Sequence, residues 1–435
     1  MRLTSSQWWL LLLGMVVGTT AAAEDSAASP PQVITSIRFV GNENTRPEIL
    51  LQEIKLRVGD VPAAGAMNDA RQAIMNLGLF TAVELRVEPD DHQGQTLVIE
   101  VREKRFVLPI PKIDRDVDGN IRAGVQLRLD NVQGLNQRIR VNYQEEDKKD
   151  LDARAKTFST SYDYPRILGT PLSFSAGVGD SRTPETVDEE LGDGSYVSHE
   201  QSVRFGISRL LDPEGPTWGW MGGVGLGWSK QTIDERDGDT SSVSDQRRVG
   251  VTLSLSNTRL NDYLYSREGH DYGVGFEFGF PALGSQGAYT RTGLYWRSFL
   301  LVTERAHTVL ATQLAMGFSS GYLFGDQYAY SIGGGNSLRG YPPDSFEGNT
   351  FLLANVEVHS PLVAKHPALQ GLVFVDFGSA YPDGNDIDSR DMHSSGGVGL
   401  RWKLKTFVNI DLRVDYARSF DDGDYKFLAG TKEVF

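Results

Sequence analysis

Two segments near opposite ends of a long region alternate between apolar and polar residues. In residues 121–130 and 408–416, apolar side chains occupy every second position and mostly charged or amide side chains lie between them. Successive side chains of a strand point to opposite faces of its sheet, so each segment predicts a strand with one apolar and one polar face. A soluble β-sandwich rarely combines so charged a face with so apolar an opposite face. The pattern therefore predicts membrane-spanning strands with one face in lipid and one in water.

Similar alternating runs recur to the end of the chain. Counting them gives sixteen strands, an even number, as a closed antiparallel barrel requires. The expected strands are 105–112, 120–130, 137–145, 156–164, 171–179, 198–209, 218–229, 246–258, 269–280, 287–300, 306–318, 350–360, 370–378, 395–404, 407–417 and 425–435. We therefore expect a mainly β protein in which residues 105–435 form a 16-stranded antiparallel transmembrane β-barrel.

Residues 33–104 have a different pattern, which predicts a small α+β domain in the order strand, helix, helix, strand, strand. A β-rich run at 34–40 comes first, and alternating apolar residues within 83–101 predict a closing hairpin with one buried face. Thr45 and Glu48 have the spacing of a capping box, so we expect the first helix to begin there with the Thr45 side chain as its cap.

The first residues predict a secretory signal peptide. Arg2 supplies the positive charge, residues 8–17 the apolar core and residues 21–23 a small-residue cleavage site. This apolar run is shorter than the roughly 20 residues that an anchoring transmembrane helix needs, and no later segment approaches that length. The expected organisation is a signal peptide at 1–23, a linker at 24–32, the small domain at 33–104 and the barrel at 105–435.

Composition narrows the chemistry further. The chain has 47 glycines, 16 tyrosines, no cysteine and a net charge of -14. The lack of cysteine excludes disulfides and thiolate metal sites, and the negative charge argues against a nucleic-acid partner. The seven histidines are scattered without metal-ligand spacing, so we expect neither a metal nor another cofactor. Gly317 to Gly321 match Gly-x-Ser-x-Gly, but no helical pattern follows, and we do not expect an enzyme.

One long segment between strands carries the most informative motif. Residues 319–349 have no strand pattern and contain Gly333, Gly334, Gly335, Arg339, Gly340 and Tyr341. Glycines permit tight turns with positive φ, and arginine is a bidentate donor, for which the strand carboxylate of Asp376 is a candidate partner. The segment follows the eleventh strand, so it is extracellular if both termini are periplasmic. At about thirty residues it is long enough to fold back into the barrel lumen.

Together these motifs resemble the Omp85 superfamily of outer-membrane barrels, of the bacterial surface antigen D15 type. The strand-helix-helix-strand-strand unit resembles a single POTRA module. The resemblance implies that the glycine-arginine segment is the family's sixth extracellular loop and that Arg339 packs on the inner barrel wall. It carries over Asp376, on the thirteenth strand, as the partner of Arg339, and Glu357, on the twelfth, as a second one. Tyr341 replaces a commoner phenylalanine, and Phe377 a usual small residue.

The first expected strand contains two prolines, Pro109 and Pro111, on either side of Ile110. Proline lacks an N–H donor and is confined to poorly paired strand edges. Because the prolines are two residues apart, both missing donors point toward the same neighbour. If that neighbour is the last strand, which ends at Phe435 and resembles a barrel sorting signal, the barrel has a weak seam. The alternative is that the prolines simply end the connection from the small domain.

The resemblance also implies a function and a location. We expect a protein of the bacterial outer membrane, with its POTRA domain in the periplasm, that inserts proteins into that membrane or translocates them across it. The expected partners are outer-membrane lipids and lipopolysaccharide, unfolded barrel or secreted protein clients, and a periplasmic protein at the POTRA domain. A carrier for a separate patatin-like lipase or other periplasmic or secreted enzyme, and a passive pore, remain open alternatives.

Overall fold

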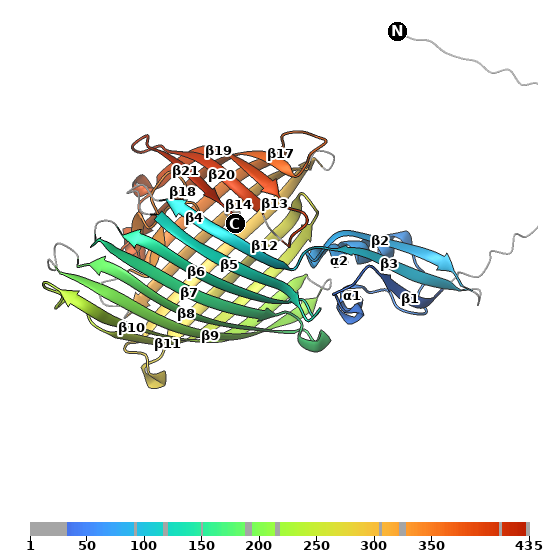
Figure 1. Ribbon diagram of the computed structural model, residues 1–435, viewed down its shortest axis with the longest axis horizontal. Coiled ribbons are helices and arrows are strands. Elements are labelled where there is room, and N and C mark those ends of the chain that lie inside the picture. Colours follow the sequence, from blue (N-terminus) through green and yellow to red (C-terminus); the bar gives the residue numbers. More distant parts are fainter. Residues whose placement is uncertain are drawn as a thin grey trace, which may run out of the picture.

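The computed structural model consists of a large β-barrel with a small domain at one end (Figure 1). It describes residues 33–90, 94–115, 121–148, 151–187, 194–213, 218–303, 307–321, 328–408 and 411–431. The expected signal peptide, the expected linker and Phe435 lie outside these residues, and the expected domain limits remain predictions.

The small domain has the expected order of elements. They are β1 (Ile34–Val40), α1 (Pro47–Glu53), α2 (Ala64–Asn76), β2 (Phe80–Pro89) and β3 (Gln95–Glu103). Its three-stranded sheet has the order β1-β3-β2, with β1 parallel and β2 antiparallel to β3. Both helices pack apolar side chains against this sheet, in a core that includes Leu50, Ile74 and Ile99. The predicted α+β domain is therefore confirmed.

The predicted capping box at the first helix is wrong. Helix α1 begins at Pro47, and no side chain caps it. The Thr45 side chain is instead buried and accepts a hydrogen bond of 2.8 Å from the side-chain amide of Asn131, near the end of the barrel strand β5 (Ile121–Val132). The Glu103 carboxylate accepts the backbone N–H of Thr45 at 2.6 Å. The threonine thus joins the two domains, a use that local sequence does not reveal.

The barrel is a 16-stranded sheet in which every paired neighbour is antiparallel, as expected (Figure 1). Its strands are β4 (Val107–Arg115), β5 (Ile121–Val132), β6 (Gln137–Lys148), β7 (Ala153–Tyr164), β8 (Leu172–Thr186), β9 (Ser195–Pro213), β10 (Gly219–Asp237), β11 (Gln246–Asp262), β12 (Arg267–Gly279), β13 (Tyr289–Thr303), β14 (Thr308–Gly321), β17 (Thr350–Pro361), β18 (Leu369–Tyr381), β19 (His393–Lys403), β20 (Asp411–Ser419) and β21 (Tyr425–Gly430).

Two differences from the expected strands have physical reasons. Strand β10 continues to Asp237, beyond the expected end, because it pairs with an equally long β9. The fifteenth barrel strand, β20, is described from Asp411 to Ser419, and Val408, which was expected in it, lies in the turn after β19. Alternation placed Val408 in the strand, but its side chain is buried in the core of the small domain.

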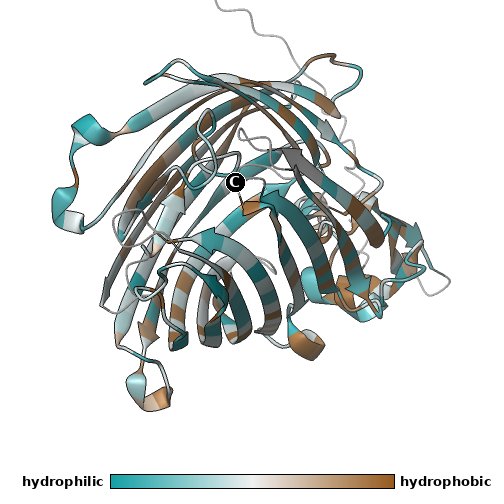
Figure 2. Ribbon diagram, turned by 60° about the vertical axis from the view of Figure 1, so that its left-hand side comes forward, coloured by the Kyte–Doolittle hydropathy of each residue, from teal (hydrophilic) through white to brown (hydrophobic). Residues whose placement is uncertain are grey.

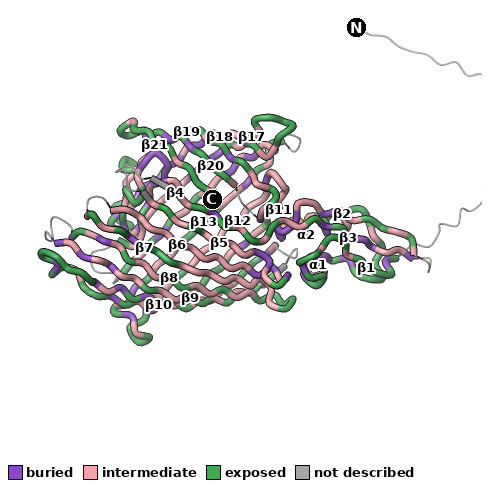
Figure 3. The backbone as a smooth tube through the Cα atoms, viewed as in Figure 1, coloured by how far each residue is buried: buried purple, intermediate pink, exposed green. Residues whose placement is uncertain are grey.

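The barrel wall separates an apolar exterior from a polar interior. Apolar and polar bands alternate along its strands (Figure 2), and most of the wall is neither fully buried nor fully exposed (Figure 3). On β18, for example, Phe377 is 42% exposed on the outer face, whereas the preceding residue, Asp376, is buried on the inner one. Such a surface suits lipid outside and water inside. None of the helices among the described residues is long and apolar enough to cross a membrane.

The small domain is docked on turns at the end of the barrel that it adjoins. The Glu53 carboxylate on α1 accepts a hydrogen bond of 2.5 Å from Arg166, in the turn between β7 and β8. The Asn76 side chain on α2 bonds to Asn261 at the end of β11. Burial raises the pKa of the Glu53 carboxyl to about 7, although the Arg166 guanidinium lowers it. Polar contacts from both helices therefore fix the domain to the barrel.

Candidate functional site

The loop between β14 and β17 folds back against the barrel wall. It contains a short hairpin of β15 (Tyr330–Ile332) and β16 (Phe346–Gly348), and between these strands lies the glycine-arginine motif. Gly334 has φ +76° and donates its N–H to the carbonyl of Tyr341 at 3.2 Å, which closes the motif into a compact turn. A side chain at Gly334 would be strained in this conformation, so the glycine is needed for the turn.

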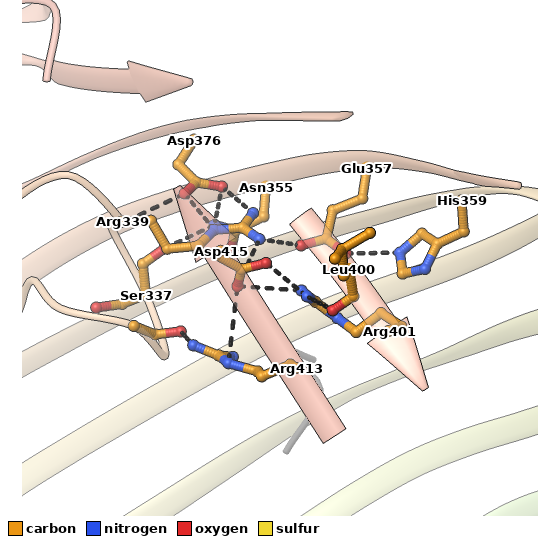
Figure 4. A network of polar contacts seen from close by, with 11 residues as sticks. Ser337, Arg339, Asn355, Glu357, His359, Asp376, Leu400, Arg401, Arg413 and Asp415 are labelled. Atoms are coloured by element: carbon orange, nitrogen blue, oxygen red, sulfur yellow. Dashed lines mark hydrogen bonds and ion pairs between the residues drawn. The ribbon is translucent and has the colours of Figure 1, made fainter. Parts of the chain in front are cut away.

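Arg339 projects from this turn onto the inner wall and is completely buried (Figure 4). Its Nε and Nη2 donate to the two carboxylate oxygens of Asp376 at 2.8 and 2.7 Å. Its backbone N–H donates to the same carboxylate at 3.1 Å. A bidentate arginine-carboxylate pair is strong and directional, so it fixes the position of the loop as well as neutralising the charge.

Two further carboxylates face the same guanidinium. Nη1 of Arg339 forms an ion pair with Glu357 on β17 and lies 3.9 Å from the carboxylate of Asp415 on β20. The Phe374 ring packs against the guanidinium in a cation-π contact, with the Cζ of Arg339 3.5 Å from the ring centroid. A buried guanidinium requires such partners because its desolvation is costly.

Two other arginines extend this arrangement into one network (Figure 4). Arg401 donates to Asp415 at 2.5 Å, and Arg413 donates to the carbonyl of Gly335 in the loop at 2.5 Å. We call the buried charged residues the Arg339 cluster: Arg339, Arg401, Arg413, Glu357, Asp376 and Asp415. Its three arginines balance its three carboxylates. Within the described part of the chain, no group of His, Cys, Asp or Glu is placed to hold a metal ion.

Gly340 and Tyr341 attach the loop to the last strands. Gly340 has φ +94°, and a Cβ there would lie 2.9 Å from both the Ser395 Cβ and the Ser419 backbone N, so only glycine fits. The Tyr341 hydroxyl lies 2.9 Å from the carbonyl oxygen of Ser394 and 2.7 Å from the carboxylate of Asp421. A phenylalanine could make neither contact. The tyrosine thus links the loop to the turn between β20 and β21.

The structure brings most of the expected loop and wall residues together, and part of the network around Arg339 was not expected from the sequence. Asn355 donates to the Ser337 carbonyl at 2.7 Å and to Asp376 at 2.8 Å. It lies two residues before Glu357, so strand alternation could have placed both on the same face. Asp415 and Arg413 share a face of β20 in the same way, but nothing local shows that this face meets the loop.

Over the residues that the structure describes, the barrel sheet is not closed between its first and last strands. Strands β4 and β21 are the two ends of the sheet order, and no ladder joins them among the described residues. Nearby, Arg105 donates its N–H to the carbonyl of Thr406 at 2.7 Å. On β4, Pro109 and Pro111 are exposed on the outer face, whereas Ile110 is buried on the opposite face. Pro109, Ile110 and Pro111 therefore lie on an edge strand of the described sheet, and Phe435 lies outside the described residues.

An antiparallel barrel with an arginine-anchored inner loop and a small α+β domain at one end defines a class of outer-membrane β-barrel proteins. The chain belongs to the Omp85 superfamily: residues 131–430 match the Omp85 superfamily domain, and residues 32–104 match a POTRA domain described as surface antigen variable number repeat. It is accordingly an outer-membrane barrel with a periplasmic POTRA domain. Its family consists of assembly factors and transporters rather than enzymes.

Two curated relatives are distant and longer. The chain is 25% identical over 427 residues to outer membrane protein assembly factor BamA of Neorickettsia risticii (strain Illinois), covering 90% of this chain and 53% of that protein. It is 28% identical over 134 residues to outer envelope protein 80, chloroplastic, of Oryza sativa subsp. japonica, covering 28% of this chain and 20% of that protein. The chain thus spans about half the length of the first relative and a fifth of the second.

Solved structures share the fold at low sequence identity. CdiB from Escherichia coli has a TM-score of 0.64 at 16% identity, covering 92% of this chain and 74% of that one. BamA from Haemophilus ducreyi lacking POTRA domains 1-3 has a TM-score of 0.54 at 16% identity, covering 92% and 85%. These similarities support the barrel and POTRA architecture.

Proposed function

We propose that this protein inserts protein substrates into the outer membrane or translocates them across it. The observation that carries the proposal is the seam, because the described parts of β4 and β21 have no ladder between them. Unpaired backbone groups at membrane depth are costly, and an extended client segment could satisfy them. The proposal includes no catalytic step.

Three parts of the molecule would cooperate in this function. Strands β1 and β2 are the edges of the POTRA sheet, and an extended client can add to such an edge. The seam then offers a second edge within the membrane. The Arg339 cluster holds β17, β18, β19 and β20 together from inside, so that the wall beside the seam keeps its shape while the seam changes.

The proposed partners follow from the same surfaces. Outer-membrane lipids and lipopolysaccharide contact the apolar exterior, and unfolded barrel or secreted proteins are the clients. A periplasmic protein at the POTRA domain is a further proposed partner.

Photo-crosslinking in living cells tests the proposal. A photoreactive residue at Ile110, next to the seam, should give adducts with other barrel or secreted proteins, identified by mass spectrometry. The same residue at Val224, on the outer face of β10 and 52% exposed, is the control and should give none. Adducts only with β21 of the same chain would support a passive pore, and adducts with a periplasmic enzyme would support the carrier alternative.

A further inference from the structure

The outer face of strands β17 to β20 carries an apolar groove close to the end of the barrel that adjoins the POTRA domain. Its volume is about 720 Å³, and none of its lining residues is charged. Two rows of side chains that are paired across β17, β18 and β19 form its base: Val358, Val373 and Val398, and, nearer the periplasm, Ser360, Gly371 and Leu400. Ser360 and Gly371 are small, so they leave space beside the larger side chains of the neighbouring rows.

This groove faces the lipid of the outer membrane. Val373 and Val398 are 56% and 55% exposed, on the face opposite to the lumen. The row that contains Gly371 lies close to the start of β18, at the periplasmic end of the strand. Trp402, which is 53% exposed, lies in the next row toward the periplasm, and aromatic side chains of this kind favour the membrane interface. The groove is therefore at the depth of the acyl chains in the periplasmic leaflet.

The Arg339 cluster lies on the inner face of the same strands. Glu357 of the cluster is next to Val358 along β17, and Arg401 of the cluster is next to Leu400 along β19. The buried charges thus fix the positions of the strands that form the groove. A preformed groove of this kind loses less conformational entropy when a ligand binds in it.

Two basic turns border the groove on its periplasmic side. Residues 362–368 connect β17 to β18, and residues 404–408 follow β19. Together they contain three basic residues and no acidic one, although the net charge of the chain is -14. Two of the basic residues, Lys365 and Lys405, are exposed lysines. The turns therefore place positive charge at the level of the phospholipid headgroups.

The two turns lie side by side. The N–H of Lys403, at the end of β19, donates to the carbonyl of Ala368, at the end of the other turn, at 2.8 Å. The ammonium of Lys403 forms an ion pair with Asp411 at 3.4 Å. The two turns thus form one basic surface directly beside the groove.

We propose that the groove and the two basic turns form one binding site for a negatively charged phospholipid of the periplasmic leaflet. One acyl chain packs along Gly371 and Leu400, and the phosphate lies between Lys365 and Lys405. Lipopolysaccharide does not fit this site, because its headgroup lies at the opposite end of the strands. This inference goes beyond the proposed function and does not depend on it.

The headgroup determines the selectivity of this site. The bilayer is as apolar as the groove, so the groove fixes the position of the acyl chain and adds little attraction of its own. A lysine near the membrane surface attracts a negatively charged lipid, whereas a zwitterionic headgroup has no net charge to attract. The site should therefore prefer phosphatidylglycerol to phosphatidylcholine with the same acyl chains.

Native mass spectrometry of the full chain, released from detergent micelles that contain one of these two lipids, tests the preference. The chain should retain one phosphatidylglycerol with an affinity roughly tenfold or more above that for phosphatidylcholine. Lys365→Gln and Lys405→Gln should each lower the affinity for phosphatidylglycerol roughly fivefold and leave that for phosphatidylcholine unchanged. Lys230→Gln, at an exposed lysine on β10, is the control and should change neither affinity.

A second pair of variants tests the groove itself. Gly371→Leu would place a side chain in the groove and should abolish the retention of both lipids. Gly222→Leu is the matched control, because Gly222 also lies on the outer face, near the periplasmic end of β10. A Cβ at either glycine would contact a leucine side chain, that of Leu362 at 2.6 Å for Gly371 and that of Leu211 at 3.2 Å for Gly222. Gly222→Leu should retain phosphatidylglycerol as the unaltered chain does.

Four results would overturn the proposal: no retained lipid, equal retention of the two phospholipids, stronger retention of lipopolysaccharide than of phosphatidylglycerol, or equal losses in Gly371→Leu and Gly222→Leu. Heat-modifiability on gels shows which variants fold. If Gly371→Leu does not fold, the variants of Lys365 and Lys405 decide, because both lysines lie in exposed turns. Cellular adducts at Ile110 do not require this site, so the lipid site and the proposed function can each fail alone.

Discussion

The Arg339 cluster and the seam lie near each other but are held in opposite ways. Strands β17 to β20 have continuous ladders and, in addition, six buried charged residues on their inner face and in the loop. Strand β21 has a ladder to β20 over Arg413 to Arg418 and no ladder to β4 among the described residues. Buried side-chain charges therefore reinforce the strands beside the seam, where the backbone ladder of the described sheet ends.

Buried ion pairs add little to net stability, but they fix the relative positions of the groups that they join. Their attraction only offsets the cost of removing charges from water, yet breaking one leaves a buried charge unpaired. The cluster is therefore suited to hold one loop position and one wall shape. At the seam, by contrast, the proposed function requires that backbone groups of the edge strands can change their hydrogen-bond partners.

The largest expected effect is that of Arg339→Ala, which would leave the buried carboxylates of Asp376 and Glu357 without the arginine and with only the Asn355 and His359 side chains as partners. It should destabilise the barrel by about 3–5 kcal/mol, measured by unfolding in detergent and by heat-modifiability on gels. Arg390→Ala is the control, because Arg390 also pairs with an aspartate, Asp388, but its side chain is 86% exposed. Its removal should have no measurable effect. If Arg390→Ala lowered the free energy of unfolding as much as Arg339→Ala does, the Arg339 cluster would not be what stabilises the loop and the wall.

Asp415→Asn tests whether the cluster acts as one unit. Asp415 neutralises Arg401 and also lies near Arg339, so the change should cost about 3 kcal/mol in unfolding free energy. Combined with Arg339→Ala, the loss should fall short of the sum by about 1 kcal/mol or more. Additive losses would show separate pairs instead of a network.

Titration of Glu53 should change the stability of the small domain, far from the Arg339 cluster. Its pKa is raised from 4.5 to about 7 by burial, so the folded domain holds a proton that the unfolded chain releases. The free energy of unfolding should therefore fall as pH rises from 4.5 to about 7, by on the order of 2–3 kcal/mol, and level off above. Hydrogen exchange of α1, corrected for intrinsic rates, measures this. Glu53→Gln should flatten the dependence, and an unchanged slope would exclude Glu53 as its source.

Tyr341→Phe gives the smallest effect and lies at the boundary between the two regions. It removes the hydroxyl that contacts Ser394 and Asp421, and should cost about 1 kcal/mol while leaving the Arg339 pairs intact. Thermal unfolding measures the loss. Tyr328→Phe, at a loop residue that is 46% exposed, is the control and should change nothing. A larger loss than that of Asp415→Asn would mean that the tyrosine, and not the charge network, anchors the loop.

Alternation was sufficient to predict the strand number and the order of the barrel, because a membrane barrel repeats one local rule along every strand. Strand parity also predicted on which side of the membrane the glycine-arginine loop lies, whereas Asp376 and Glu357 were expected as partners of Arg339 from the family resemblance. Alternation did not identify Asp415, because it gives the face of a residue but not the segment that it meets. Thr45 and Val408 escaped prediction for the same reason, since each acts across the interface between the domains.

The burial of Val408 within the POTRA core has a consequence for the timing of folding. The small domain leaves the ribosome before the barrel, but its core includes a side chain from the turn before β20. A POTRA fragment without the barrel would expose the apolar surface that Val408 covers. The small domain therefore completes this part of its core only when the turn after β19 is in place.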